Sequence, residues 1–310
     1  MMRAMAVVMR SHFEAQDVLE SGATVAYGTT SGWLNRSLQV MAEARRPKAL
    51  ALGPTTPLVL RGPAAAESWG PGGLAARDPR LASILQDLYV GDSMLGFALA
   101  NGIATQSLAL SATEVGAKSA GSGPVEMAEV GKSGARKEAP DHARQLGATL
   151  AGFLVQPTGP RIAAVEVDGF DTHALQGASE GQLASRLLAL DAFIAGLEGG
   201  LGPAWGNTVV LVATEFGRTA HVNGTAGTDH GTASTALLLG GAVRRGGIIG
   251  DWPTLAQARL FENRDTAPTM DMRSLFKGVL RDHLGLDRAS LDRTVFPGSV
   301  QAAPADNLIA

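Results

Sequence analysis

The sequence predicts an α/β fold in which a mostly parallel central sheet carries helices on both faces. Short apolar runs alternate with longer amphipathic segments, which is the pattern of strands separated by helices. The chain has 310 residues, of which 45% are hydrophobic, so it can bury a sizeable core. We therefore expect residues 1–310 to form one α/β domain.

The predicted elements follow from periodicity and from glycine positions. Short apolar runs predict strands at 4–9, 161–167, 208–215 and 235–243, and the segment "KALALGPTTPLVLRG" favours a strand, a turn and a second strand. Helical spacing predicts helices in "RSHFEAQDVLESG" up to Gly22, at 32–44, in 80–110, at 179–202 with Gly199 and Gly200 as its stop, and at 272–285.

Residues 116–142 differ in composition from the rest of the chain. They are rich in Gly, Ala, Ser and Lys and poor in large apolar side chains. Such composition is typical of loops and linkers, and loops of this length are often mobile or functional. We expect a mobile insertion without catalytic residues.

Charge and cysteine content exclude several classes of protein. The net charge is −3, the pI is near 6.1 and the basic residues are spread out, so nucleic-acid and membrane partners are not expected. The chain has no cysteine, which excludes disulfides and thiolate metal ligands. No apolar run reaches the ~18 residues of a membrane span. The oligomeric state stays open.

Polar side chains gather where the predicted strands end. In an open α/β sheet, ligands bind beyond the carboxyl ends of the strands. The loop before strand 235–243 joins this edge only if it folds back. The segments concerned hold Arg10, Ser11 and His12; Asp168, Asp171 and His173; Glu215 and Arg218; and Asp229 and His230.

These residue types point to a metal centre. Aspartate, glutamate and histidine without sulfur suit zinc, manganese or similar divalent ions. Two such ions ~3.5–4 Å apart can hold the attacking and leaving oxygens of a phosphoryl or sulfuryl transfer. A hydroxyl beside them can be the nucleophile, and Ser11 is the candidate.

Each candidate also has a structural interpretation. Asp168 and Asp171 suit a turn in "DGFD", and "GTDHG" is good loop composition around Asp229. Ser11 and Glu14 match a helix capping box. The guanidinium of Arg10 or of Arg218 can bind an anion or form a structural salt bridge. Asp229 can itself be a ligand or orient His230.

Several long segments, among them "VDGFDTHALQGASEGQLASRL" and "TEFGRT" followed by "GTDHG", resemble the bacterial domain of unknown function 1501 family. That family is regarded as a branch of the alkaline phosphatase-like superfamily, which includes sulfatases. The resemblance implies that Asp171, His173 and His230 bind one metal, that Glu215 binds a second, and that Ser11 is the nucleophile. It implies an alkaline phosphatase-like fold.

The resemblance also implies a function and a compartment. The function is metal-dependent hydrolysis of a small phosphate or sulfate ester, with zinc as the first choice of metal and manganese, calcium or magnesium as alternatives. A non-catalytic metal-binding or scaffold protein is the other hypothesis. Family members usually carry a "RGG-DGLN"-like segment and a twin-arginine export signal upstream. The chain as given starts near "SHF", which leaves two hypotheses. Either the true start lies upstream and the protein is periplasmic, or this is a truncated form that is cytoplasmic and lacks one metal ligand, in which case the hydrolase can be inactive.

Overall fold

The computed structural model describes most of the chain. It covers residues 10–43, 47–53, 55–70, 135–244 and 246–310, together with residues 85, 88, 89, 92, 95, 99, 100, 102–105 and 108. Residues 4–9 and 116–134 lie outside the described residues. The predicted first strand and most of the predicted insertion therefore lie outside them too.

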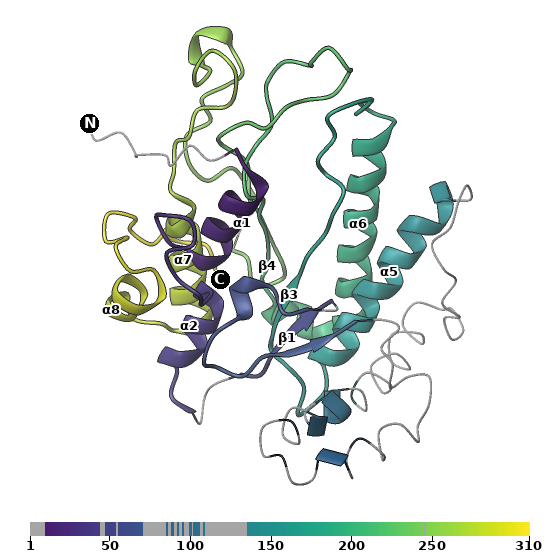
Figure 1. Cartoon of the computed structure of the whole chain (residues 1–310), viewed down its shortest axis with the longest axis vertical. Helices are drawn as coiled ribbons and strands as arrows, with labels where there is room; N and C mark the ends of the chain where they lie inside the picture. The colour runs from purple at the N-terminus through teal and green to yellow at the C-terminus, as the bar shows by residue number, and fades with distance from the viewer. Residues whose placement is uncertain are drawn as a thin grey trace.

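A three-stranded parallel sheet lies at the centre of the molecule (Figure 1). Its strand order is β2-β1-β3, and a separate antiparallel pair is formed by β4 and β5. The strands are β1 (Ala49–Leu52), β2 (Glu67–Trp69), β3 (Ile162–Val165), β4 (Val210–Val212) and β5 (Leu237–Leu239). The helices are α1 (His12–Ser21), α2 (Trp33–Val40), α5 (Ala135–Leu154), α6 (Gln182–Leu201), α7 (Met272–Leu284) and α8 (Arg288–Ser290). Shorter turns are η2 (Leu58–Leu60), η4 (Gly202–Asn207), η5 (Gln257–Arg259) and the π-helix η6 (Leu291–Val295).

Helices cover both faces of the parallel sheet, as the sequence predicts. In a strand, successive side chains point to opposite faces. Leu50 and Leu52 of β1 pack with α5 and α6, and Ala49 and Ala51 pack on the opposite face with Leu38 of α2. Figure 1 shows α5 and α6 on one side of β1 and β3, and α1, α2 and α7 on the other. The mixed α/β fold is confirmed.

Helix α6 and the turn after it are the one segment, among the described residues, long and apolar enough to cross a membrane. This segment spans Gln182–Asn207 and has a mean hydropathy of 1.3. Its side chains Phe193 and Leu197 are buried in the core between α5 and the sheet. Only 22% of the apolar window is buried, and Leu187 and Leu188 on the same helix are exposed.

The prediction for "KALALGPTTPLVLRG" is half right. Ala49–Leu52 form β1, but Leu58–Leu60 form the 3-10 turn η2 and not a second strand. The backbone groups of this turn bond to side chains: Val59 N–H donates to Glu20 Oε2, and the Asn35 amide donates to the carbonyl of Leu60. The strand that pairs with β1 is instead β2, at Glu67–Trp69, which carries no apolar run that periodicity could detect.

The predicted mostly parallel central sheet contains β1, β2 and β3 in the described structure, whereas β4 and β5, also predicted from apolar runs, form a separate pair. Strand β5 pairs antiparallel with β4, with Val210 opposite Leu239. Parallel pairing requires a crossover connection, which is usually a helix. Residues 213–236 between the two strands contain no helix and return the chain beside β4.

Two of the predicted helix ends are confirmed and two other predictions are corrected. Gly22 and Gly285 end α1 and α7 in the left-handed conformation that favours glycine. Helix α6 runs through Gly199 and Gly200 and ends before Gly202. Within the predicted insertion, residues 135–142 are helical and begin α5. Ala, Arg, Lys and Glu in this segment are good helix formers, so a composition rich in small and charged residues did not distinguish a helix start from a loop. Between 80 and 110, the described residues other than Asp92 are helical.

Candidate metal centre

The loop between β4 and β5 folds back, which brings "GTDHGT" to the other polar segments. Thr219 N–H donates to the carbonyl of Asp229 at 2.9 Å, and Gly231 N–H donates to the carbonyl of Gly217 at 2.7 Å. A Cβ on Gly227 would lie 2.2 Å from the backbone of His173. Glycine is therefore required for this close approach, and it places the Asp229 segment directly on the residues that follow β3.

Three ligand atoms meet at the centre of the site. The Nε2 atoms of His173 and His230 lie 2.9 Å apart, and they lie 2.9 and 3.0 Å from Oδ1 of Asp171. Neighbouring ligands of one divalent ion, each bound at ~2.0–2.2 Å, lie about 3 Å apart in the same way. The structure thus brings together Asp171, His173 and His230, which the sequence proposed as ligands of one metal.

Each of the two imidazoles has a hydrogen-bond partner at Nδ1, and their Nε2 atoms lie 2.9 Å apart. His230 Nδ1 faces the carbonyl of Arg10 at 2.8 Å, and a carbonyl only accepts. His173 Nδ1 faces the carboxylate of Asp229 at 3.4 Å. The tautomer of each ring decides whether its Nε2 donates to Asp171 Oδ1 or is bare. With the proton on Nδ1 in both rings, two bare Nε2 atoms and the Asp171 oxygen would face one point, which is the arrangement that a divalent ion requires.

Asp229 supports His173, not His230 as the sequence suggested. Its Oδ1 accepts from the Asn223 amide at 2.9 Å and faces His173 Nδ1. The Asn223 amide also donates to the carbonyl of His173, so Asn223 and Asp229 of this loop both contact His173. Carboxylates in this position fix the tautomer and the orientation of a metal-binding imidazole.

His12 is a component of the centre that sequence reasoning did not assign a role. Its Nε2 lies 3.1 Å from Oδ2 of Asp171, and its Nδ1 lies 2.8 Å from Oε1 of Glu215. His12, Asp171 and His230 offer ligand atoms that all lie within 4.8 Å of one another. Glu215, predicted as a ligand, thus reaches the cluster through His12. The sequence did contain a signal for His12, because this histidine follows Ser11 in the segment after the predicted strand 4–9, at the sheet edge where the other candidates were expected.

The electrostatic balance keeps Asp171 ionised. Burial by itself would raise the pKa of this carboxyl, but hydrogen bonds from Arg218 and His12 overcome the effect and hold the pKa well below its usual range. Burial would likewise lower the pKa of His12, and the carboxylates of Glu215 and Asp171 outweigh it and raise the pKa above its ordinary value.

Both candidate arginines have carboxylate partners. Arg218 Nη1 donates to Asp171 Oδ1 at 2.5 Å and its Nε donates to the Thr228 hydroxyl at 3.0 Å. Arg10 pairs with Glu262 at 2.7 Å and lies 3.5 Å from the buried carboxylate of Asp265. The salt-bridge interpretation therefore describes both guanidinium groups in this structure.

The side chains of Ser11 and Asp168 make none of the hydrogen bonds that join the other candidate residues in the described structure. Ser11 is the N-cap residue of α1, but its side chain makes no capping hydrogen bond, so the predicted capping box with Glu14 does not form. It lies between Arg10, whose carbonyl binds His230, and His12. Asp168 is exposed, and among the described residues it makes none of the hydrogen bonds of the cluster. It fits the turn interpretation better.

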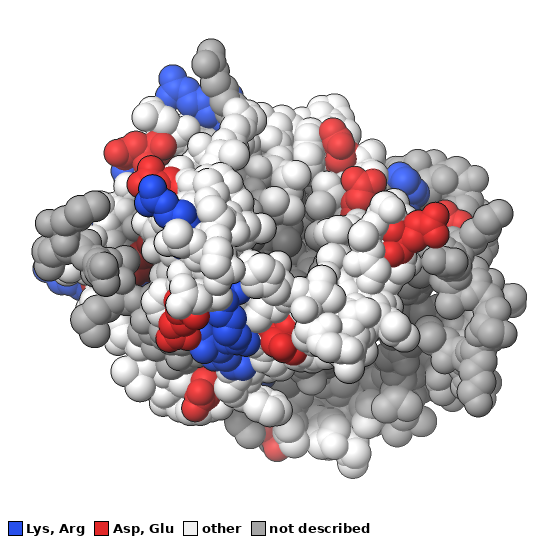
Figure 2. Space-filling view, turned by 90° about the horizontal axis from the view of Figure 1, so that it is seen from above, with Lys and Arg blue, Asp and Glu red and all other residues white. Residues whose placement is uncertain are grey.

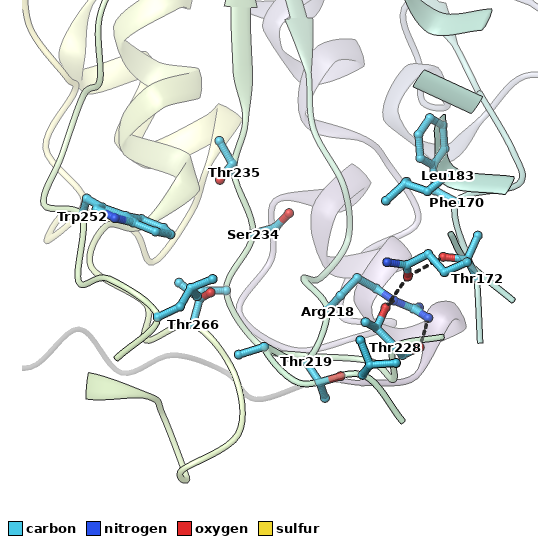
Figure 3. A pocket seen from close by; sticks show the side chains of 15 residues that line it. Phe170, Thr172, Leu183, Arg218, Thr219, Thr228, Ser234, Thr235, Trp252 and Thr266 are labelled. Carbon is cyan, nitrogen blue, oxygen red and sulfur yellow. Dashed lines mark hydrogen bonds between the residues drawn. The ribbon is translucent and has the colours of Figure 1, made fainter. Parts of the chain in front are cut away.

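A pocket of about 400 Å³ lies next to the cluster of Asp171, His173 and His230, and Arg218 stands between the pocket and Asp171. Figure 3 shows Trp252 on one side of the pocket and Phe170 and Leu183 on the other. Arg218 lines this pocket and also donates a hydrogen bond to Asp171, so the pocket and the cluster share this residue.

Figure 2, which looks down from the top of Figure 1, shows acidic and basic side chains mixed in small groups, separated by uncharged surface.

The fold and the site define a mixed α/β protein with a candidate divalent-metal centre on loops that follow its strands. A protein-family model described as "Protein of unknown function (DUF1501)" matches residues 5–295, and the chain belongs to this family. The resemblance noted in the sequence is thus confirmed at the level of the family. Comparisons with the curated proteins and with the solved structures find no match.

Proposed function

We propose that this protein is a metal-dependent hydrolase of small phosphate or sulfate esters, with an alkaline phosphatase-like fold and zinc as the first choice of metal. The observation that carries the proposal is the convergence of Asp171, His173 and His230 at 2.9–3.0 Å. Nitrogen and oxygen ligands without sulfur suit zinc, and also manganese, magnesium or calcium with less nitrogen preference.

The chain's own residues supply the remaining parts of the proposed reaction. Asp171, His173 and His230 would hold the divalent ion, which would supply Lewis-acid stabilisation of the ester oxygens. The Ser11 oxygen forms a bond to phosphorus or sulfur while the bond to the alcohol breaks and the alcohol leaves with a proton. Water then hydrolyses the seryl ester, which releases inorganic phosphate or sulfate and returns the serine hydroxyl. The chain around Ser11 is fixed on both sides, by the Arg10 carbonyl on His230 and by His12 on Asp171.

The second candidate is a metal-binding protein without catalysis. It is favoured by the arginines: in the described structure the guanidinium groups of Arg10 and Arg218 are paired with carboxylates. An anionic ester would have to compete with these partners. This hypothesis shares the metal centre with the first and differs only in turnover.

The experiment measures metal content and turnover on the same preparations. Protein stripped with a chelator is reloaded with zinc, manganese or calcium, its metal is determined by elemental analysis, and hydrolysis of p-nitrophenyl phosphate and p-nitrophenyl sulfate is followed. His230→Ala is compared with His142→Ala, an exposed histidine on α5. We expect bound metal and turnover that His230→Ala alone abolishes. Metal without turnover supports the second candidate, and no bound metal rejects both.

A further inference from the structure

We propose that the pocket beside Arg218 binds an uncharged ring that carries several hydroxyl groups, as a sugar residue does. We further propose that this ring is the organic part of the ester whose anionic group meets the metal cluster. The first statement concerns the pocket alone, and the second rests on the proposed function.

The pocket offers no unpaired charge to a ligand. Among the described residues that line it, Arg218 alone is charged, and its guanidinium already donates to Asp171 and to both the hydroxyl and the carbonyl of Thr228. A charged group placed here would lose its water without gaining an opposite charge, which is unfavourable. The ligand of this pocket is therefore uncharged.

Apolar side chains face the pocket from two sides. Trp252 lies on one side and Phe170 and Leu183 on the other (Figure 3). Trp252 is 55% exposed, so its ring is not committed to the core of the protein. An aromatic ring that is open to solvent beside a pocket binds flat apolar surfaces, such as one face of a sugar ring.

Hydroxyl groups line the pocket near Trp252. The Thr214 hydroxyl donates to the carbonyl of Phe216 at 2.8 Å, so the Ser234 hydroxyl donates to Thr214 at 2.8 Å and keeps its lone pairs to accept from a ligand. Within the described part of the chain, the hydroxyls of Thr235 and Thr266 form no hydrogen bond. A bare aryl or alkyl group would cover these hydroxyls without pairing them, which costs free energy. A ring that carries hydroxyls can pair with them.

The pocket is connected to the metal cluster through two residues. Arg218 lines the pocket and donates to Asp171 at 2.5 Å, and Thr172, which lines it too, lies between Asp171 and His173 in the chain. A ring bound in the pocket thus has the cluster as its neighbour. A volume of about 400 Å³ lies in the range of small-molecule sites and suits one ring with its substituents better than a long chain.

The pocket is tested with uncharged probes on metal-free protein, so that catalysis plays no part. The sugar probes are methyl α-glucopyranoside, methyl β-galactopyranoside and N-acetylglucosamine, and the ring probes without several hydroxyls are cyclohexanol and benzyl alcohol. Binding is followed by saturation-transfer NMR and by tryptophan fluorescence. The variants are Trp252→Ala and Ser234→Ala, with Leu188→Ala, an exposed apolar side chain on α6, as the control.

We expect at least one sugar to bind more tightly than cyclohexanol and benzyl alcohol. We expect Trp252→Ala and Ser234→Ala each to weaken its binding by about tenfold or more, and Leu188→Ala to leave it unchanged. The proposal is overturned if no sugar binds up to about 100 mM, if the other rings bind equally well, or if the pocket variants bind the sugar as the parent does.

The second statement has its own readout, which separates it from the proposed function. On metal-loaded protein, the phosphate and sulfate esters of the sugar that binds should have a higher kcat/KM than the p-nitrophenyl esters, and Trp252→Ala should raise KM for them while leaving kcat unchanged. Hydrolysis of p-nitrophenyl esters in preference to every sugar ester overturns the second statement alone. Sugar binding without any ester hydrolysis overturns the proposed function and leaves the pocket assigned.

Discussion

Asp171 connects the two halves of the candidate centre. One of its oxygens lies within 3.0 Å of both His173 Nε2 and His230 Nε2, and the other lies 3.1 Å from His12. The carboxylate is held ionised by the hydrogen bonds of Arg218 and His12, against the effect of burial on its pKa. Its removal should therefore affect every imidazole of the cluster at once.

Asp171→Asn is the first prediction at this scale. An amide is a poor ligand for zinc and carries no charge to offset the ion, so we expect the variant to lose at least about a hundredfold in metal affinity. Isothermal titration with zinc measures the change. Asp168→Asn is the matched control, since Asp168 belongs to the same loop, is exposed and contacts none of the cluster in the described structure. Equal losses in the two variants would mean that the loop, and not the Asp171 carboxylate, matters.

Asp229→Asn is the second prediction. In this structure Asp229 contacts His173 Nδ1 and not the point where the three ligand atoms meet. Residues that orient a metal ligand typically account for about 10–100-fold in metal affinity. The loss should therefore be smaller than that of Asp171→Asn, and Asp229→Glu should restore part of it. A loss as large as that of Asp171→Asn, without rescue by glutamate, would make Asp229 a direct ligand.

Residue types indicated three of the side chains that the structure brings together, Asp171, His173 and His230, but not the contacts around them. Asp171, His173 and His230 are recognisable because their side chains are common metal ligands near predicted strand ends. The role of His12 depends on two carboxylates, Asp171 and Glu215, that reach it from other segments. No local pattern encodes such contacts, which exist only after the chain has folded.

At the scale of elements, α5 and α6 cross where both helices carry glycine. A Cβ on Gly147 of α5 would lie 2.0 Å from the carbonyl oxygen of Phe193, and a Cβ on Gly196 of α6 would lie 2.0 Å from that of Arg144. The two backbones therefore touch directly. This crossing presses Phe193 and its neighbours onto the sheet, so it positions the whole helical layer.

Gly196→Ala should separate the two helices and destabilise the fold. Overpacking of this kind typically costs about 1–3 kcal/mol. Gly199→Ala in the same helix is the matched control, because nothing lies within 4 Å of a Cβ there, and alanine should stabilise the helix by about 0.5–1 kcal/mol. Urea unfolding followed by circular dichroism measures both free energies. Changes of the same sign would contradict the direct contact of the two backbones.

The start of α7 provides a prediction that depends on pH. Asp271 is the N-cap and accepts from Arg273 N–H at 2.9 Å. Burial would raise the pKa of Asp271, but the Arg273 side chain and backbone outweigh it and lower the pKa. A lowered folded-state pKa contributes stability above the unfolded pKa of ~3.9, and this contribution is lost as the pH falls through the folded value.

Asp271→Asn keeps a capping side chain and removes the charge. Its free energy of unfolding should be lower than that of the parent at neutral pH, and the difference should shrink as the pH falls below about 4. Urea midpoints measured between pH 3 and pH 7 test this expectation. Asp168→Asn, in an exposed loop, should show no such trend. A difference that grows toward low pH would mean that the Asp271 charge does not stabilise the folded state.

Periodicity predicted four of the helices and the apolar strands, but it did not predict helix α5, the turn η2 or the strand β2. The helices α1, α2, α6 and α7 follow from apolar spacing and glycine positions. The turn η2 forms because Asn35 and Glu20 bond to its backbone, and β2 forms because its neighbour β1 offers an edge. Both causes lie in other parts of the chain, so a local pattern could not indicate them.

At the scale of the whole molecule, the candidate centre ties together segments that are far apart in the chain. The start of α1, the loop after β3 and the loop after β4 each supply side chains. The rule that ligands bind at strand ends predicted the loops after β3 and β4. The position of His230 depended on a long loop folding back, which required Gly227 and Gly231 to pack on the backbones of His173 and Arg218. From the sequence alone, we could say only that His230 joins the other residues if this loop folds back.

Since the ligands come from such distant segments, a bound ion should stabilise the folded chain against unfolding. A ligand at about one hundred times its Kd stabilises a protein by about 2.7 kcal/mol if it binds only the folded state. We expect zinc at that excess to raise the Tm by several degrees and a chelator to reverse the rise, as differential scanning fluorimetry would measure. Asp171→Asn should abolish the shift, while Asp168→Asn should keep it. A zinc-dependent rise of equal size in Asp171→Asn would show that the ion binds elsewhere, and the metal centre would then have to be abandoned.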